Sequence, residues 1–419
     1  MSEIAPHRVG TPTPLISHLT AAIGILETGA RLAPAAPTAE QGSAATESTW
    51  SSPPPQQLSN AIRAAAQTNP HGLALALRVE AANRLMAMLD GLRKYQTHPA
   101  QRDLAEMPTV WRAGGVRLLD YGPSNGRPVL VTPSLVNRYH VLDLDKGDSL
   151  IRYLSANNLR PLVVDWGEPR ATESRMNLGD YVAQRLIPAF DAALALTGAA
   201  QTAVFGYCMG GALSLALADA RPEEVSKLAI MGAPWDFSGM APMRGALAGL
   251  IPGGPEAAIQ SATNAAAAFG ALPADMLQQV FARLDPGLAL KKFRQFAAMD
   301  QESAAAKRFV LIEDWLNDGP PLSGPAAVEA LTDWQKGNVT MKGDWKVDGM
   351  PVDPTTLHPP AMVFAATRDR IAPPAATEPL AQLIPGARLV RPETGHVGMI
   401  VGRAARAQVW APLVDFLQD

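Results

Sequence analysis

The chain has 419 residues, of which 47% are hydrophobic and 18% charged, and its formal net charge is −3 at pH 7. A nearly neutral chain without a sustained basic stripe argues against a nucleic-acid partner, and a single cysteine excludes an internal disulfide and Cys-rich zinc sites. Neither a signal peptide nor a membrane-spanning apolar run is recognisable, so we expect a cytoplasmic protein without a transmembrane segment.

We expect little packed structure in the N-terminal part of the chain. Residues 1–58 are rich in Pro, Ala, Ser and Thr, and we expect most of them to form a flexible tail. Within them, Leu15–Leu26 predicts a short amphipathic helix that docks on an apolar surface, and docking on its own protein is favoured. Helical spacing of apolar residues follows from Ala61 to Lys94, so residues 59–106 are predicted to be a helical lead-in to the core.

From residue 107 the pattern changes to short strands that alternate with helices. The first two strands form a hairpin over Thr109–Leu119 that turns at Gly114 and Gly115. Five compact apolar runs suit strands that are buried on both faces: Pro128–Val131, Pro161–Val164, Thr202–Phe205, Lys227–Ile230 and Ala361–Phe364. This alternation predicts a mostly parallel central sheet with helices on both faces, which is the layout of an α/β-hydrolase.

Residues 234–353 interrupt the alternation and divide the predicted core into segments 107–233 and 354–419. The interruption is mainly helical and includes Leu272–Leu284 and Ala306–Trp315. Insertions in sheets of this kind lie at the carboxyl ends of the strands, where ligands bind. We therefore predict that residues 234–353 form a cap over an active site.

Cys208, the only cysteine, lies where three apolar residues lead into Gly-x-Cys-x-Gly. Glycines at positions 206 and 210 allow the chain to turn sharply from a buried strand into a helix, which holds the side chain of the middle residue clear of both. This pattern predicts a nucleophile elbow that carries sulfur. The alternative interpretation is a small thiol packed in a core.

A catalytic thiol needs a base, and the base needs an orienting carboxylate, in the chain order Cys, Asp, His. Asp369 follows the strand Ala361–Phe364, and His396 lies in a glycine-flanked loop after one helix and one short strand. We interpret His396 as the general base and Asp369 as the group that fixes its tautomer. The rival bases are His140 and His358, and the rival carboxylates are Asp165 and Asp314.

An acyl-transfer site also needs backbone N–H donors for an oxyanion, one after the nucleophile and one in the loop after the third strand. Met209 would supply the first. For the second we expect a residue of the loop Thr132–His140 around Val136. Asn137, in the same loop, is either a site residue or a plain turn residue.

Five ordered blocks between Val129 and Gly402 resemble the polyhydroxyalkanoate (poly-3-hydroxybutyrate) synthase family, whose members use a cysteine nucleophile on an α/β-hydrolase fold. The blocks are Thr132–Leu144, with its asparagine and Leu-Asp-Leu; the cysteine box Gly206–Gly211; Trp315–Gly319 with Val347–Asp353; Asp369–Pro373; and Gly395-His396. The chain departs from the family at Arg370, where a histidine is usual, and in a shorter N-terminal part. The resemblance is therefore that of a divergent member.

The resemblance implies an acyltransferase that polymerises (R)-3-hydroxyacyl-CoA into polyhydroxyalkanoate through a Cys208 thioester, with release of CoA. It also implies that His396 activates the cysteine or the incoming hydroxyl, that Asp369 supports His396, and that Asn137 lies near the substrate. The implied partners are 3-hydroxyacyl-CoA and the polyester chain, with a homodimer or a polyester-granule surface left open. Neither a metal nor a cofactor beyond the CoA thioester is implied.

Two other functions stay open at this point. A cysteine-dependent hydrolase of the same fold would cleave polyhydroxyalkanoate or an acyl-CoA, as a depolymerase or a thioesterase, if water reaches the thioester. A non-catalytic, granule-associated binding protein would keep the fold and bind polyester or a partner synthase through Leu15–Leu26, although the intact Cys, Asp and His set argues against it. The sequence specifies neither the acyl chain length, nor a partner subunit, nor the oligomeric state.

Overall fold

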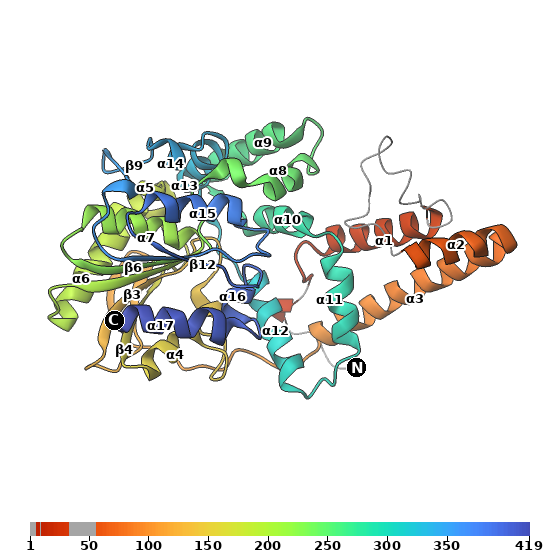
Figure 1. Ribbon diagram of the computed structural model, residues 1–419, viewed down its shortest axis with the longest axis horizontal. Helices are drawn as coiled ribbons and strands as arrows, with labels where there is room; N and C mark the ends of the chain where they lie inside the picture. The colour runs from red at the N-terminus through yellow and green to blue at the C-terminus, as the bar shows by residue number, and fades with distance from the viewer. Residues whose placement is uncertain (1–5, 9, 33–55) are drawn as a thin grey trace. The chain divides into compact units, whose positions relative to one another are not determined.

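The computed structural model describes residues 6–8, 10–32 and 56–419, and the chain divides into two compact units (Figure 1). Unit 1 comprises residues 1–99 and 285–310, and unit 2 comprises residues 100–284 and 311–419. No helix among the described residues is both long enough and apolar enough to cross a membrane.

Unit 1 is helical. Its long helix α3 (Pro70–Gln96) begins after Asn69, whose side-chain oxygen accepts the Gly72 N–H at 2.8 Å, and Pro70 occupies the first helical position. Helices α1 (Leu15–Leu32), α2 (Gln56–Thr68) and α11 (Leu288–Ala297) pack against α3. A Cβ at Gly91 would collide with the backbone of Phe293, so glycine permits the close approach of α3 and α11.

The helix predicted over Leu15–Leu26 is confirmed and extends to Leu32. It packs against α3 and α11 of the same unit, as expected for docking on its own protein. The flexible-tail prediction falls largely on residues 1–5, 9 and 33–55, which lie outside the described residues. The predicted helical lead-in consists of α2 and α3, separated at Asn69.

Unit 2 is built on one sheet, with eight strands among the described residues, in the order β1-β2-β4-β3-β5-β6-β11-β12. β1 pairs with β2 as the predicted antiparallel hairpin, β2 is antiparallel to β4, and the neighbours from β4 to β12 are parallel. The strand bounds are β1 (Thr109–Ala113), β2 (Val116–Asp120), β3 (Arg127–Thr132), β4 (Leu159–Asp165), β5 (Thr202–Tyr207), β6 (Val225–Met231), β11 (Ala361–Phe364) and β12 (Arg388–Val390).

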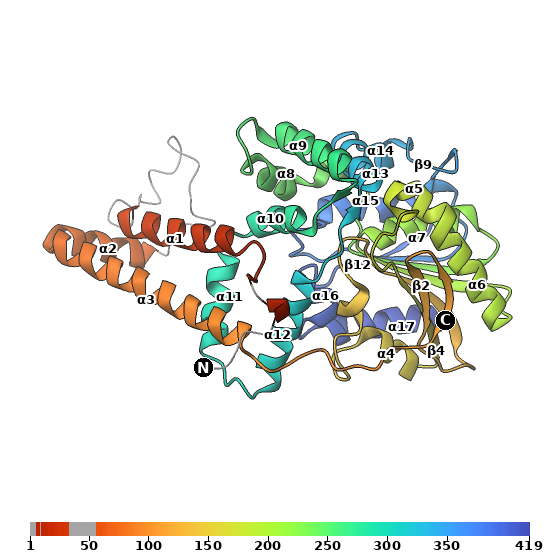
Figure 2. The same ribbon diagram turned by 180° about the vertical axis from the view of Figure 1, so that it is seen from behind.

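Both faces of this sheet are covered by helices, which confirms the predicted fold class (Figures 1 and 2). β4, β5 and β11 are buried at every residue, as continuous apolar runs in a parallel sheet should be. Successive residues of β5 contribute to opposite cores, Val204 to one and Phe205 to the other. One face is covered by α6 (Ile187–Thr197), α7 (Met209–Ala220) and α15 (Pro374–Leu383), and the other by α4 (Leu150–Ala156) and α17 (Ala411–Gln418).

The mainly helical insertion predicted between β6 and β11 is present. It contains α8 (Ala241–Ala248), α9 (Gly254–Phe269), α10 (Ala274–Leu284), α11, α12 (Ala304–Asn317), α13 (Gly324–Glu329), the π-helix η8 (Ala330–Lys336), α14 (Val339–Lys342), and the short strand pairs β7 (Ala271–Leu272) with β8 (Leu322–Ser323) and β9 (Lys346–Val347) with β10 (Met350–Pro351). Residues 285–310 group with unit 1, so the insertion is not one compact body. Its role as a cap, and the other predicted domain boundaries, stay predictions.

Short helical segments complete the described structure. They are η1 (Pro6–Arg8) in unit 1 and, in unit 2, η4 (Tyr139–Leu142), η5 (Glu173–Arg175), α5 (Leu178–Tyr181), η6 (Val182–Leu186), η7 (Phe237–Gly239), η9 (Pro354–Thr356), α16 (Gly398–Val401) and η10 (Arg406–Trp410).

Candidate active site

Cys208 occupies a sharp turn between β5 and α7, as the glycine pattern predicts. Its backbone lies at φ 56° and ψ −132°, a conformation that costs energy for a residue with a Cβ. Two hydrogen bonds of 2.8 Å hold the turn: the Cys208 N–H donates to the Met231 carbonyl, and the Gly211 N–H donates to the Cys208 carbonyl. A Cβ at Gly206 would lie 2.6 Å from both the Gly210 carbonyl and the Ser214 hydroxyl, so this position requires glycine.

The loop after β3 packs directly against this turn. Thr132, the last residue of β3, is in register with Gly206 of β5. A Cβ at Gly210 would collide with the carbonyl oxygens of Thr132 and Pro133, so the N-terminus of α7 and the loop touch through their backbones. The Trp166 indole N–H donates to the Pro133 carbonyl at 2.9 Å and fixes the loop from its other side.

His396 and Asp369 are brought together from neighbouring strands. Asp369 follows β11 and His396 follows β12, and His396 Nδ1 lies 2.6 Å from Asp369 Oδ2. The other carboxylate oxygen of Asp369 accepts the backbone N–H groups of Ile371 and Ala372, each at 2.8 Å. Because a carboxylate only accepts hydrogen bonds, the proton lies on Nδ1, which leaves the second ring nitrogen of His396 to the Cys208 thiol.

The site favours a charged thiol and a charged imidazole. Burial by itself raises the pKa of the Cys208 thiol, but His396, the Met209 N–H and the Ser134 hydroxyl outweigh it, and the pKa lies below its ordinary value. Burial lowers the pKa of His396, but Asp369 and Cys208 outweigh it and raise the pKa well above its ordinary value. As a whole residue, Cys208 is only half-buried.

The ring of Tyr207 packs beside the ring of His396. Its ring centroid lies 5.2 Å from that of His396, with 32° between the ring planes. The side chain is buried, and its hydroxyl has no hydrogen-bond partner among the described residues. The ring, rather than the hydroxyl, is therefore what Tyr207 presents to the imidazole.

The predicted oxyanion residues are placed differently from one another. The Met209 N–H lowers the pKa of the Cys208 thiol, and its role as an oxyanion donor stays a prediction. The Val136 N–H instead donates to the Ser134 hydroxyl oxygen at 3.2 Å, within its own loop. Asn137 lies beside Gly319, which follows the end of α12 in the insertion. Ser134, which the sequence patterns did not single out, is the loop residue whose hydroxyl lowers the pKa of the Cys208 thiol.

The insertion is tied to the same loop. The Trp315 indole N–H donates to the Arg138 carbonyl at 2.7 Å, and the Arg138 guanidinium pairs with Asp318 at 3.0 Å. Arg370, which follows the orienting aspartate, donates to the carbonyl of Leu284 at the end of α10 at 3.3 Å. The residue at which this chain departs from the synthase pattern therefore contacts the insertion.

The rival candidates have other surroundings. Burial lowers the pKa of His140 to about 4, and its ring lies against Tyr139 within η4. Asp165 is paired with Arg117 at 2.6 Å. Neither His358 nor Asp314 is among the groups that act on the Cys208 thiol or on His396.

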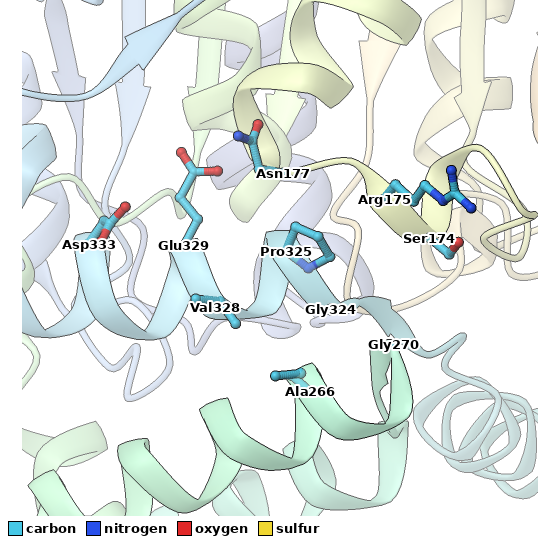
Figure 3. A pocket seen from close by; sticks show the side chains of 11 residues that line it. Ser174, Arg175, Asn177, Ala266, Gly270, Gly324, Pro325, Val328, Glu329 and Asp333 are labelled. Carbon is cyan, nitrogen blue, oxygen red and sulfur yellow. The ribbon is translucent and has the colours of Figure 1, made fainter.

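A cavity of about 580 Å³ lies elsewhere in unit 2, between α9, α13 and the segment before α5 (Figure 3). Its most buried carboxylate, Glu329, extends toward Asn177 and accepts hydrogen bonds from the Leu178 N–H at 2.6 Å and the Trp345 indole N–H at 2.8 Å. These bonds give Glu329 a structural role. Cys208, Asp369 and His396 do not line this cavity.

The comparisons with known proteins agree with the fold. The model of the alpha/beta hydrolase fold family matches residues 128–403. The chain is 27% identical over 318 residues to the poly(3-hydroxyalkanoate) polymerase subunit PhaC of Haloferax mediterranei, covering 74% of this chain and 63% of that one. It is 28% identical over 296 residues to the PhaC of a Synechocystis species, covering 70% and 78%.

The resemblance to polyhydroxyalkanoate synthases is thus confirmed. A third relative, the PhaC of Haloarcula marismortui, is 28% identical over 295 residues, which cover 70% of this chain and 61% of that one. The chain spans less than two thirds of the length of the Haloferax and Haloarcula relatives.

Proposed function

Because the chain belongs to the alpha/beta hydrolase fold family, we propose that Cys208, His396 and Asp369 form the catalytic triad of an acyltransferase that makes polyhydroxyalkanoate from (R)-3-hydroxyacyl-CoA. The observations that carry the proposal are the strained elbow at Cys208 and the contact of His396 with Asp369 at 2.6 Å, and His396 lowers the pKa of the Cys208 thiol. The polymerase name of the relatives supports a polyester as the product.

The first step loads the enzyme. The Cys208 thiolate attacks the thioester carbonyl of the acyl-CoA, a carbon–sulfur bond forms, and the carbonyl electron pair moves onto oxygen. The Met209 N–H, from the residue directly after the nucleophile, donates to this oxyanion. When the carbonyl reforms, the bond to the CoA sulfur breaks, and the CoA thiolate leaves with the proton of the His396 imidazolium.

The second step extends the chain. Neutral His396 accepts the proton of a 3-hydroxyl group as its oxygen attacks the Cys208 thioester. The new carbon–oxygen bond is an ester linkage, and the carbon–sulfur bond to Cys208 breaks. The thiolate and the imidazolium are then restored together, so no proton is left over.

Sulfur suits such a cycle because acyl transfer from one thiol to another is nearly isoenergetic. The acyl group on Cys208 stays as activated as it was on CoA, whereas a serine ester would be a resting point. The proposed surroundings are the cytoplasm and the surface of a polyester granule, with CoA thioester as substrate, no further cofactor and no metal. A homodimer stays a prediction.

The partial exposure of Cys208 supports one alternative. If water reaches the acyl-enzyme, the same triad would hydrolyse it, and the protein would be a depolymerase or a thioesterase.

The test is purified protein with 3-hydroxybutyryl-CoA, with free CoA and insoluble polymer measured in the same reaction. Cys208→Ala is the blank. We expect CoA release matched by polyester, with neither in the blank. CoA release that yields only free hydroxy acid would support the thioesterase instead. Release that persists in the blank would remove Cys208 from the mechanism.

A further inference from the structure

We propose that Gly232, the residue directly after β6, is a positioning residue for the imidazole of His396, and that it must lack a side chain to hold this role. The inference rests on the proposed role of His396 as the base of the triad. It concerns a residue that neither the glycine pattern of the elbow nor the chain order of Cys, Asp and His singles out.

The end of β6 lies between the strands that lead to the nucleophile and to the orienting carboxylate. In the sheet, β6 is flanked by β5, which precedes Cys208, and by β11, which precedes Asp369. The Cys208 N–H donates to the Met231 carbonyl at 2.8 Å. On the other side, the Gly232 N–H donates to the Phe364 carbonyl at 2.9 Å. The last residue of β6 and the glycine after it therefore join the backbone of the elbow to the end of β11.

Gly232 also faces one edge of the His396 ring. A Cβ at position 232 would lie 3.1 Å from Cε1 and 3.2 Å from Nδ1 of His396. Both distances are shorter than the separation of about 3.5–4.0 Å at which nonbonded carbon atoms attract each other best. The imidazole can therefore lie where it does only because residue 232 has no side chain.

The edge that Gly232 faces is also the edge that bonds to the carboxylate. His396 Nδ1 lies 2.6 Å from Asp369 Oδ2, and the Tyr207 ring packs beside the imidazole with 5.2 Å between the ring centroids. A methyl group at position 232 would push the imidazole from its place, or would push the backbone of residue 232 away from Phe364. Either movement alters the relative positions of the three triad residues.

The competing explanation is conformational. Gly232 has a φ of +61°, at which a residue with a Cβ is strained, so glycine could be required for the turn alone. A Cβ would also lie 2.7 Å from Cε of Met399, which is the end of a flexible side chain and can move aside. Each of these effects would lower stability without changing the pH at which Cys208 reacts.

The test compares Gly232→Ala and Gly232→Asn with the unaltered full-length protein. Alkylation by iodoacetamide as a function of pH reports Cys208 alone, because the chain has no other cysteine. Asparagine adopts a positive φ more readily than alanine, so Gly232→Asn adds a Cβ with less backbone strain than Gly232→Ala does. The matched control is Gly198→Ala, because Gly198 has a φ of +65° but a Cβ there would meet nothing within 4 Å.

We expect both Gly232 variants to move the midpoint of alkylation to higher pH, because a displaced imidazole pairs less well with Asp369 and favours the Cys208 thiolate less. Below the midpoint, the alkylation rate should fall about tenfold for each pH unit by which the midpoint moves. CoA release from 3-hydroxybutyryl-CoA should slow by on the order of 10²-fold. Gly198→Ala should keep the midpoint of the unaltered protein.

An unchanged midpoint in both Gly232 variants would overturn the proposal. A midpoint that moves in Gly232→Ala but not in Gly232→Asn would also overturn it, because the effect would then come from backbone strain. An equal movement in Gly198→Ala would lead to the same conclusion. Circular dichroism and urea unfolding show that each variant is folded when its midpoint is measured.

The two proposals can fail separately. The midpoint is measured without acyl-CoA, so it decides the role of Gly232 even if the unaltered protein releases no CoA, a result that would contradict only the proposed function. A moved midpoint with undiminished CoA release would show that the position of His396 does not limit acyl transfer, and would overturn that part of the inference.

Discussion

The backbone of Cys208 stores strain at the point where chemistry is proposed. A residue with a Cβ at φ 56° and ψ −132° costs on the order of 1–3 kcal/mol, and the hydrogen bonds to Met231 and from Gly211 hold it there. The turn holds the thiol where His396, the Met209 N–H and the Ser134 hydroxyl lower its pKa.

Asp369 should control the pH range over which Cys208 reacts. In Asp369→Asn the carboxylate that raises the pKa of His396 is lost, so the imidazole loses its charge at lower pH and no longer favours the thiolate. The pKa of Cys208 then rises, and alkylation should fall about tenfold per pKa unit on the acid side. Iodoacetamide rates between pH 5 and 10, roughly the range that brackets both groups, check this.

The matched control is Asp165→Asn, which removes a carboxylate that also ends a strand of the sheet but pairs with Arg117. Its alkylation profile should equal that of the unaltered protein. If the alkylation rate of Asp369→Asn fell at the same acidic pH as that of the unaltered protein, Asp369 would not set the charge of His396.

Tyr207 should act through its ring. Tyr207→Phe removes a buried hydroxyl that has no described partner, so the free energy of unfolding should change by less than about 1 kcal/mol. Tyr207→Ala removes the wall beside His396 and should cost roughly 3–5 kcal/mol. Urea unfolding measures both. A Phe variant as unstable as the Ala variant would mean that the hydroxyl has a partner.

The residues at the site differ in how far the sequence reveals them. Cys208, Asp369 and His396 can be predicted because the fold fixes their order and the strands that precede them, although their catalytic roles stay predictions. Ser134 and Tyr207 have no such pattern: a serine two residues after a strand is an ordinary loop residue. Their importance depends on which strands are neighbours, since β3 and β5 pair only in the folded sheet.

At the scale of elements, the contact between α7 and the loop after β3 decides the geometry of the elbow. Gly210→Ala would push a methyl group into the carbonyl oxygens of Thr132 and Pro133. We expect a loss of roughly 1–3 kcal/mol in the free energy of unfolding, because neither backbone can yield freely. Alkylation of Cys208 should slow as well, since the Ser134 loop and the Met209 N–H are displaced together.

Gly245→Ala is the control for that substitution, because Gly245 is also helical but a Cβ there would meet nothing within 4 Å. It should be neutral or gain about 0.5–1 kcal/mol, the ordinary difference between the two residues in a helix. If Gly210→Ala were equally harmless, the loop and the helix would not be in tight contact.

Strands buried on both faces were the most predictable elements. The predicted Pro128–Val131 is β3 with one further residue at each end, and the predicted Ala361–Phe364 is β11. The helix predicted from Leu272 begins instead at Ala274, because Ala271 and Leu272 pair with β8 about fifty residues later in the chain. Local periodicity carries no information about a partner so far away.

At the scale of the whole molecule, the N-terminal segment contributes to the packing of unit 1. Arg8 is fully buried, donates to the carbonyls of His98 and Tyr95, and lies over the ring of Tyr95. Arg8→Ala leaves those carbonyls without this donor and should cost roughly 1.5–3 kcal/mol. Hydrogen exchange in α3 should accelerate, whereas the alkylation rate of Cys208 in unit 2 should not change.

Arg78→Ala, which removes an exposed arginine from α3, is the control for this prediction. Its exchange rates should equal those of the unaltered protein. Equal exchange in Arg8→Ala would show that the buried guanidinium does not stabilise the unit.

The division into units could not be predicted from the sequence. The apolar face of α11 indicates that Leu290, Phe293 and Phe296 are buried, but not against which helix. In the sequence, α11 belongs to the insertion. In the structure, the close approach at Gly91 shows that α11 packs against α3. A lone glycine in a helix does not reveal such a contact.

This arrangement has a consequence for how the protein is made. The chain passes between the units three times, after residues 99, 284 and 310. During synthesis the first helices of unit 1 leave the ribosome well before α11, which follows only after β1 to β6 have emerged. Unit 1 can be complete once residue 310 has emerged, but the last strands of unit 2, β11 and β12, come later still. The sheet of unit 2 therefore cannot be complete until the chain is nearly finished. Removal of residues from the C-terminus should therefore destabilise the whole sheet, including the strands that are made first.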